Sequence, residues 1–180
     1  MRKVVLLTLL TVDGVAEAPE LFVSDFDEVM EEHLARVISS QDTVVLGRRM
    51  HDEWAKYWPT SDDEPFASFI NSVPKYVATS TPLTADWTNV SVIDGDPVDF
   101  VRALKAEPGG DIGVHGSIAL SQSLLAAGVI DELELVVTPS LTGRGRRLFV
   151  GEEAQHLHLV RSTQSPTGSV VLSYRVPRVS

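Results

Sequence analysis

Two glycine-centred stretches of the sequence carry residues suited to binding phosphate. Gly116 and Ser117 stand between a short apolar run, Asp111 to His115, and a segment from Ile118 to Leu125 whose apolar residues recur at helical spacing. A glycine at the end of a strand lets a ligand approach the backbone closely, and the free N–H groups at the start of a helix attract an anion. Gly116 and Ser117 are therefore candidates for holding a phosphate group.

The second stretch, Val44 to Met50, repeats this order of strand, glycine and helix start. Arg48 and Arg49 directly follow Gly47, so a guanidinium group and the helix dipole could act on the same anion. Taken alone, either stretch is more typical of an ordinary strand–helix connection. A third apolar run ends in Thr79-Ser80-Thr81, and ligands of open α/β sheets bind at the carboxyl ends of strands. The repetition favours an extended ligand with more than one phosphate.

Other reactive side chains give weaker indications of metal binding, ligand binding or catalysis. His156 and His158 have no nearby carboxylate that would complete a set of metal ligands, so no metal is expected. His115, beside Gly116, is expected to be half-buried and could touch a ligand. Ser117 does not lie in a GxSxG sequence and has no evident base, which argues against a nucleophile.

The carboxylates of the first expected helix do not identify a residue that binds or protonates the substrate. Three glutamates of this helix point away from its apolar stripe, as solvated residues do: Glu28, Glu31 and Glu32. Asp25 and Asp27, near the helix start, are as typical of capping as of catalysis. The sequence therefore assigns no catalytic residue and no proton donor.

Composition narrows the class of protein. The chain has 180 residues with 15 Lys and Arg against 25 Asp and Glu, a formal net charge of −10. This balance argues against binding to nucleic acid, which usually needs a basic face. The absence of cysteine fits a cytoplasmic protein. No apolar run approaches the roughly 20 residues that span a bilayer, so no membrane association is expected.

The hydrophobic pattern predicts an α/β sandwich in a single domain, residues 1–180. Expected strands are Lys3 to Thr11, Thr43 to Leu46, Lys75 to Thr79, Val90 to Ile93, Asp111 to His115 and Leu133 to Val137. Helices are expected at Asp25 to Ser40, from Arg48, at Asp62 to Asn71, at Asp96 to Ala106 and from Ile118. Trp54 and Trp58 should pack in the core. Strands that alternate with helices form a mostly parallel sheet, and Pro166-Thr167-Gly168 closes a C-terminal antiparallel hairpin.

Several motifs, taken in order, resemble a known family. They are TLLTVDGVAE, VVLGRRM, PKYVATST, the Gly-Ser turn with its helix, VIDELEL and TPSLTGRGRRLF. Together they resemble the dihydrofolate-reductase-like proteins, and more narrowly those related to the C-terminal reductase domain of the bifunctional riboflavin-biosynthesis deaminase-reductase. The resemblance covers nearly the whole chain. It implies a three-layer α/β/α fold that binds NADPH, and it implies a homodimer, for which the strand Leu133 to Val137 and the terminal hairpin offer a surface.

The resemblance also implies a role for particular residues. Those that look like the family's cofactor-binding positions are Thr11, Val12 and Gly14 near the nicotinamide, Gly47, Arg48 and Arg49 at the adenosine 2′-phosphate, Ser80 and Thr81 near the adenine ribose, and His115, Gly116, Ser117, Ile118 and Leu120 around the pyrophosphate. Met50 stands where many relatives have Thr, so a preference for NADPH should rest on the arginine pair. The Gly-Ser turn differs from the Gly-Gly of folate enzymes.

The sequence therefore predicts an NADPH-dependent reductase that transfers hydride to a small acceptor, either pterin-like or similar to a ribosylamino-pyrimidine. The alternative is a nucleotide-binding protein without turnover, with a regulatory or vestigial role. An open polar pocket beside the nicotinamide would favour the enzyme. The sequence leaves open whether the loop Arg144 to Arg147 binds substrate phosphate, binds the cofactor or contacts only solvent.

Overall fold

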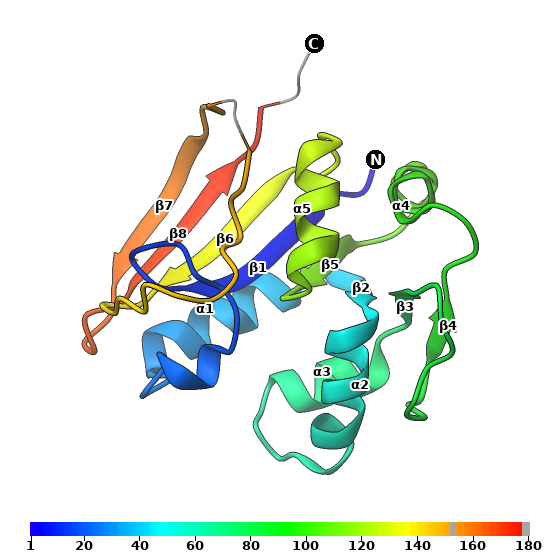
Figure 1. The fold of residues 1–180 in the computed structure, drawn as a ribbon, viewed down its shortest axis with the longest axis horizontal. Helices are drawn as coiled ribbons and strands as arrows, with labels where there is room; N and C mark the ends of the chain where they lie inside the picture. The colour runs from blue at the N-terminus through cyan, green and yellow to red at the C-terminus, as the bar shows by residue number, and fades with distance from the viewer. Residues whose placement is uncertain (152–153, 178–180) are drawn as a thin grey trace.

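One mixed sheet runs through the protein. The computed structural model describes residues 1–151 and 154–177, and in this part of the chain eight strands pair in the order β4-β3-β2-β5-β1-β6-β8-β7 (Figure 1). The strands are β1 Val4–Leu10, β2 Gln41–Gly47, β3 Lys75–Ala78, β4 Val90–Val92, β5 Asp111–His115, β6 Glu132–Val137, β7 His158–Gln164 and β8 Val170–Arg175. β4 through β6 pair in parallel, and β8 joins β6 and β7 antiparallel. The expected mostly parallel sheet with a C-terminal hairpin is confirmed.

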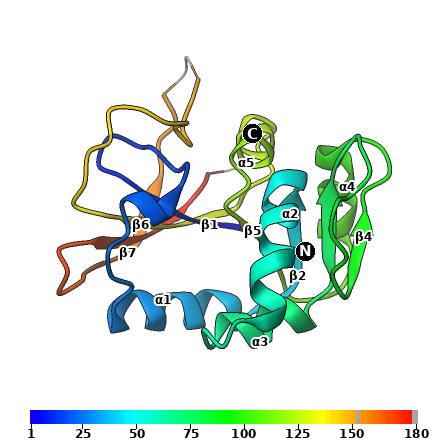
Figure 2. The ribbon, with the colours of Figure 1, turned by 60° about the horizontal axis from the view of Figure 1, so that its bottom comes forward.

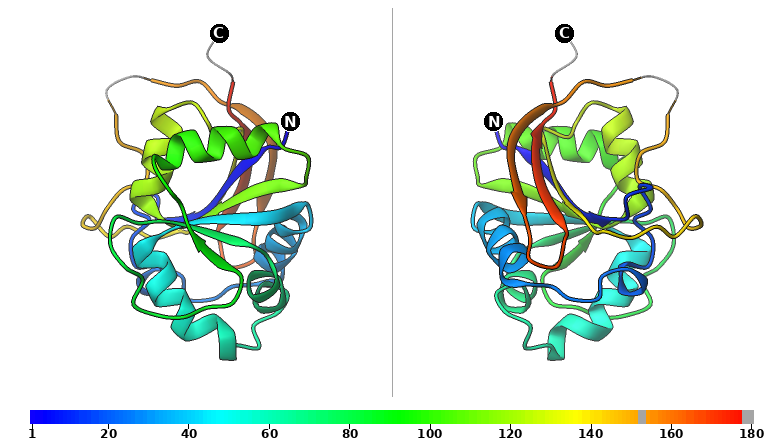
Figure 3. Two further views of the ribbon diagram at one scale, coloured as in Figure 1. Left: turned by 90° about the vertical axis from the view of Figure 1, so that its right-hand side faces the viewer. Right: turned by 90° about the vertical axis from the view of Figure 1, so that its left-hand side faces the viewer.

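Helices cover both faces of this sheet. They are α1 Glu28–Ile38, α2 Arg48–Tyr57, α3 Phe66–Ser72, α4 Pro97–Ala106 and α5 Ile118–Ala126, with short 3-10 turns at Pro19–Leu21 and Trp58–Thr60. α4 and α5 lie on one side of the sheet, and α1, α2 and α3 lie on the other (Figure 3). The three-layer arrangement is confirmed. Within the described residues, no helix has the length and apolar character needed to cross a membrane.

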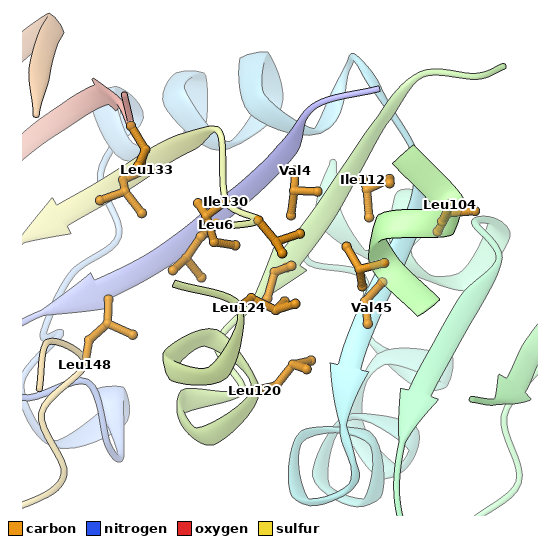
Figure 4. Packing of buried hydrophobic residues seen from close by; sticks show 14 of the residues in the cluster. Val4, Leu6, Val45, Leu104, Ile112, Leu120, Leu124, Ile130, Leu133 and Leu148 are labelled. Carbon is orange, nitrogen blue, oxygen red and sulfur yellow. The ribbon is translucent and has the colours of Figure 1, made fainter. Parts of the chain in front are cut away.

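The apolar alternation of the strands builds a core on each face. Val45 of β2 packs with Leu104 of α4 and Leu124 of α5 in the larger cluster (Figure 4). Its neighbours Val44 and Leu46 point the other way, into the cluster under α1 and α3. Because successive side chains of a strand face opposite sides, a strand covered on both faces must be apolar throughout. That is why three apolar residues follow one another in β2, from Val44 to Leu46.

Asp27 is a capping residue. Its carboxylate accepts from the backbone N–H groups of Val29 (3.1 Å) and Met30 (3.2 Å) at the start of α1. It also accepts from the hydroxyls of Ser165 and Thr167 in the β7–β8 turn. The Ser165 hydrogen bond is the largest of the contacts that lower the pKa of Asp27 to about 2. Of the two roles that the sequence left open for Asp27, capping is therefore the one observed. Its hydrogen bonds also connect α1 to the β7–β8 hairpin.

A buried lysine stabilises the start of β3. The Nζ of Lys75 donates to the carbonyls of Ile70 (2.7 Å) and Val73 (2.9 Å) and lies 4.5 Å from the centroid of the Trp87 ring. Burial lowers the pKa of Lys75 from 10.5 to about 8, because removing the ammonium from water disfavours its charged form. The folded protein therefore releases this proton at a lower pH than the unfolded chain does.

We expect Lys75 to make stability rise with pH between about 8 and 10.5. In this window the unfolded chain still binds a proton that the folded state has lost, so the free energy of unfolding increases, by at most about 1.4 kcal/mol per pH unit. Urea unfolding across the window should show this rise in the parent relative to Lys75→Met. The exposed Lys56→Met is the control, and equal pH slopes for the parent and Lys75→Met would contradict the prediction.

Candidate functional site

A cavity of about 1510 Å³ runs along the edge of the sheet where β2, β3 and β5 end. Residues of α1, α2 and α3 line it. Figure 2 shows α3 next to α1. Residues Leu7 to Leu9 of β1 form part of its wall. The carboxyl ends of neighbouring parallel strands meet at the same edge, so ligand-binding residues from distant parts of the chain come together here.

Most of the residues that the sequence suggested line this cavity. They are Gly47, Arg48, Arg49, Ser80, His115, Gly116, Ser117, Ile118 and Leu120. Their convergence follows from the strand order, because β5 and β3 are the two neighbours of β2. The structure thus brings the two glycine turns and the end of β3 to one place.

Four suggested residues lie elsewhere. Thr11, Val12 and Gly14 line a smaller hollow of about 480 Å³, together with residues of β6 and β8. In β1, Leu7 and Leu9 border the large cavity, whereas Leu10 packs in the core below α5. Thr81 lines neither space, and its carbonyl accepts from the Thr79 hydroxyl (2.6 Å). The proposed nicotinamide contacts therefore lie apart from the phosphate-suited residues.

Two helices begin at the cavity without a side-chain cap. Gly47 precedes α2 and Ser117 precedes α5, and neither side chain satisfies the first N–H groups of its helix. α1 and α4, by contrast, are capped by Asp27 and Asp96. An uncapped helix start presents unpaired N–H groups and a partial positive charge. The two helix starts on the cavity are therefore suited to anions.

A hydrogen bond joins the two helix starts. The Ser117 hydroxyl accepts from the Gly47 N–H at 2.9 Å. A Cβ on Gly47 would lie 3.6 Å from Ser117, an ordinary contact, and the φ of Gly47 is −81°. Gly116 differs, since its φ is +58° and a Cβ there would lie 2.3 Å from the Cε of Met50. Gly116 is thus required by the backbone, whereas the backbone and surroundings of Gly47 would accept a Cβ.

The arginines beside Gly47 are paired with carboxylates. The Nε of Arg48 lies 3.3 Å from Asp52, and the Nη1 of Arg49 lies 3.5 Å from Glu17. Glu17 also accepts from the Nε of Arg146 at 2.8 Å, and this bond lowers the pKa of its carboxyl group. Arg48 and Arg49 have exposed side chains, 43% and 69%, so they can still turn toward an anion in the cavity.

His115 is buried, so the expectation that it would be half-buried is wrong. It is 1% exposed, and its Nε2 lies 2.8 Å from the Gln41 side-chain oxygen. Gly113 makes room for this pair, because a Cβ there would lie 2.1 Å from that oxygen. Burial lowers the pKa of His115 to about 3, so the ring is neutral at pH 7. Among the described residues, its Nδ1 has no hydrogen-bond partner.

Aromatic residues of the cavity were missed in the sequence. Trp54, Trp58 and Phe66 line it as well as packing against the core. Trp54 and Trp58 contact edge to face, with ring centroids 5.8 Å apart. Two tryptophans four residues apart indicate one helix face, but only the folded structure shows that they also border a cavity.

A buried polar cluster was missed too. His33 of α1 lines the cavity, and its Nε2 lies 3.5 Å from the Glu134 carboxylate of β6. Glu134 accepts from Ser173 (2.5 Å) and from Arg36 (3.2 Å). A glutamate between Leu133 and Leu135 of a buried strand was the available signal, since a buried carboxylate needs partners. In the described residues, no group of three or more possible ligands could hold a metal.

Comparisons with known proteins agree on one family. The model of the RibD C-terminal domain matches residues 2–171. The uncharacterized protein YyaP of Bacillus subtilis (strain 168) is 26% identical over 182 residues, which cover 96% of this chain and 94% of YyaP.

Solved structures show the same fold. A protein of Shewanella sp. PV-4, provisionally named as a riboflavin biosynthesis protein, is 19% identical with a TM-score of 0.78 over 98% of this chain and 99% of its own. The Thermotoga maritima diaminohydroxyphosphoribosylaminopyrimidine deaminase/5-amino-6-(5-phosphoribosylamino)uracil reductase is 12% identical with a TM-score of 0.70, over 98% of this chain and 57% of that protein. The shared fold is dihydrofolate-reductase-like.

Proposed function

The chain belongs to the RibD C-terminal domain family, and we propose that it is an NADPH-dependent reductase that transfers hydride to a small heteroaromatic acceptor, similar to a pterin or to a ribosylamino-pyrimidine. The observation that carries this proposal is the pair of uncapped helix starts, at α2 and α5, that open side by side on one cavity. Two such starts suit a ligand with several phosphates. We propose a cytoplasmic enzyme, a location that suits a chain without cysteine.

The residues at the two helix starts fit this cofactor. Gly116 and Ser117, with the first N–H groups of α5, would hold the pyrophosphate. Arg48 and Arg49, at the start of α2, would hold the adenosine 2′-phosphate as guanidinium donors. When bound, the nicotinamide supplies the hydride.

The cavity also extends beyond the helix starts, which favours an enzyme over a nucleotide-binding protein without turnover. Leu9 of β1, Met30 of α1 and Trp54 of α2 line this extension and would exclude water from the transferred hydride. A screen of flat heteroaromatic acceptors for NADPH oxidation distinguishes the two functions. Tight NADPH binding with no oxidation by any acceptor would favour the alternative.

Gly47→Ala should weaken NADPH binding without unfolding the protein. The backbone of Gly47 is extended and the nearest side-chain atoms to a new Cβ lie 3.6 Å away, so stability should change by no more than about 1 kcal/mol. A methyl group beside the α2 start would obstruct the approach of a phosphate, and we expect at least a roughly tenfold higher Kd, or about 1.4 kcal/mol. Fluorescence titration with NADPH and thermal unfolding test this; an unchanged Kd in a folded variant would refute the assignment.

Replacing Arg48 and Arg49 together by Ala should weaken NADPH binding far more than NADH binding. Charge-assisted hydrogen bonds contribute roughly 1.5–3 kcal/mol each, and the 2′-phosphate has no other strong partner near α2 if the assignment is right. The NADPH affinity should also fall with salt more steeply in the parent than in the variant.

The matched control is Arg102→Ala with Lys56→Ala, which removes two exposed cations outside the cavity lining. Its affinities for both cofactors should equal those of the parent. Equal losses for NADPH and NADH in the Arg48 and Arg49 variant would mean that the pair acts on the shared part of the cofactor or on folding.

We also propose a homodimer, through the hairpin part of the surface first expected. β6, Glu132–Val137, lies between β1 and β8 with its leucines buried, so it offers no free surface. Within the described residues, β7 of the hairpin pairs only with β8 and is exposed along its whole length, and Leu159 and Val160 are 55% and 60% exposed. An unpaired, partly apolar edge strand suits a symmetric contact with a second copy.

Light scattering at micromolar concentration should therefore give the mass of a dimer. Val160→Lys, which places a charge on the exposed edge strand, should shift the protein to a monomer that still binds NADPH. The exposed Glu28→Lys on α1 serves as the control for an added lysine. A monomeric parent would remove the dimer proposal.

A further inference from the structure

The charges that line the cavity are unevenly distributed. Carboxylates outnumber guanidinium groups eight to three: Glu17, Glu20, Glu31, Glu53, Asp62, Asp63, Glu64 and Asp96 against Arg48, Arg49 and Arg146. Two of the three arginines begin α2, at the proposed cofactor position, and Arg146 is held by Glu17. The end of the cavity between α1 and residues 58–65 has only acidic side chains among its charged residues.

The carboxylates at this end have no cationic partner. Glu31 comes from α1, Glu53 from α2, and Asp62 to Glu64 from the connection to α3. Asp63 accepts from Tyr57 and Ser61, and Glu64 accepts from Ser68 (2.7 Å), all neutral groups. In the part of the chain that the structure describes, no ion pair reaches any of these carboxylates. Of these carboxylates, Glu53 lies one helical turn from Arg49, so a phosphate here would meet mainly like charge.

The cation of α1 is held by a buried carboxylate. Arg36, one turn beyond His33 on α1, lies 3.2 Å from Glu134 and donates to Ser173 at the same distance. The Arg36 side chain is 41% exposed, whereas Glu134 is 4% exposed, so an exposed guanidinium pairs with a carboxylate buried under the sheet. Removing Arg36 from Glu134 to bind a ligand would leave a buried carboxylate unpaired, which is strongly unfavourable.

Neutral ring nitrogens take the place of cations on the inner wall. His33 is 5% exposed and His115 is 1% exposed, and both line the cavity. The Nδ1 of His115 has no hydrogen-bond partner among the described residues, whereas the Nε2 of His33 lies 3.5 Å from the Glu134 carboxylate. Burial lowers the pKa of His33 to about 4, so both rings are neutral at pH 7. Buried polar atoms are normally hydrogen-bonded, so the Nδ1 of His115 indicates a polar ligand.

Flat apolar surfaces complete this end of the cavity. Trp54, Trp58 and Phe66 supply aromatic rings, and Met30 and Leu34 of α1 line the cavity as well. Such walls favour a planar ring that stacks on the aromatic side chains and forms a few hydrogen bonds at its edge. Carboxylates surround these aromatic walls at the rim of the cavity, and the neutral histidine rings lie at its inner wall.

We propose, on the premise that the protein is the reductase described above, that its acceptor is an uncharged or cationic heteroaromatic molecule that carries no phosphate, bound between α1 and residues 58–65. The substrate named for the Thermotoga maritima protein is a phosphoribosyl compound. The acceptor of this chain would differ from that compound by the missing phosphate.

Matched pairs of ligands test this specificity. The probes are 5-amino-6-(ribosylamino)uracil with its 5′-phosphate, and 6-hydroxymethylpterin with its monophosphate ester. Binding is followed by quenching of tryptophan fluorescence, since Trp54 and Trp58 line the cavity. We expect at least one unphosphorylated probe to bind, and its phosphorylated partner to bind at least about tenfold more weakly. Equal or tighter binding of the phosphorylated partner, or binding of neither pair, would overturn the proposal.

Charge-neutralising variants test the cause. Glu31→Gln with Glu53→Gln should reduce the discrimination against the phosphorylated probe several-fold, because it removes two of the repelling charges. Glu28→Gln with Glu32→Gln removes two exposed carboxylates of α1 outside the cavity lining and should leave the discrimination unchanged. Equal effects of the two double variants would contradict a local origin.

NADPH affinity is measured in parallel, because probe binding does not require the cofactor. If the probes behave as expected but NADPH does not bind, the reductase function fails while the acceptor specificity stands. If NADPH binds and is oxidised only with phosphorylated acceptors, the reductase function stands and the acceptor specificity fails.

Discussion

The hydrogen bond from the Gly47 amide to the Ser117 hydroxyl joins two strand ends that are 70 residues apart in sequence. It fixes the starts of α2 and α5 next to each other, and both starts keep free N–H groups because no side chain caps them. That pairing is possible only because β2 and β5 are parallel neighbours, so that both end at the same edge of the sheet. The proposed cofactor site depends on this arrangement.

The remainder of the cavity is determined by how the polar groups under the sheet are satisfied. The Glu134 carboxylate accepts from Ser173 and from Arg36. Gln41 contacts one nitrogen of His115 in the space that Gly113 leaves by lacking a Cβ. These bonds pair the buried carboxylate of Glu134. The inner wall of the cavity then carries the neutral rings of His33 and His115. The unpaired carboxylates remain at the rim, so the cavity separates a cationic end from an acidic end.

Local sequence signals determined the elements. The Asp96-Pro97 pair predicted the start of α4, since aspartate caps a helix and proline suits its first turn, and Asp96 does accept from the amides of Val98 and Asp99. The apolar run of β2 and the Pro166-Thr167-Gly168 turn depend on neighbouring residues alone. The residues around Gly47 and Gly116 were found for the same reason, because a strand, a glycine and a helix start are adjacent in the chain.

Only the tertiary structure decided which of these residues share a space. Thr11 and Val12 follow β1 closely in sequence, but they line a smaller hollow with residues of β6 and β8, whereas Leu7 to Leu9 of β1 border the large cavity. The burial of His115, the pairing of His33 with Glu134 and the exposure of one face of Trp54 to the cavity all require contacts between distant segments. Spacing along the chain does not indicate such contacts, because they depend on the strand order and on how the helices pack on the sheet.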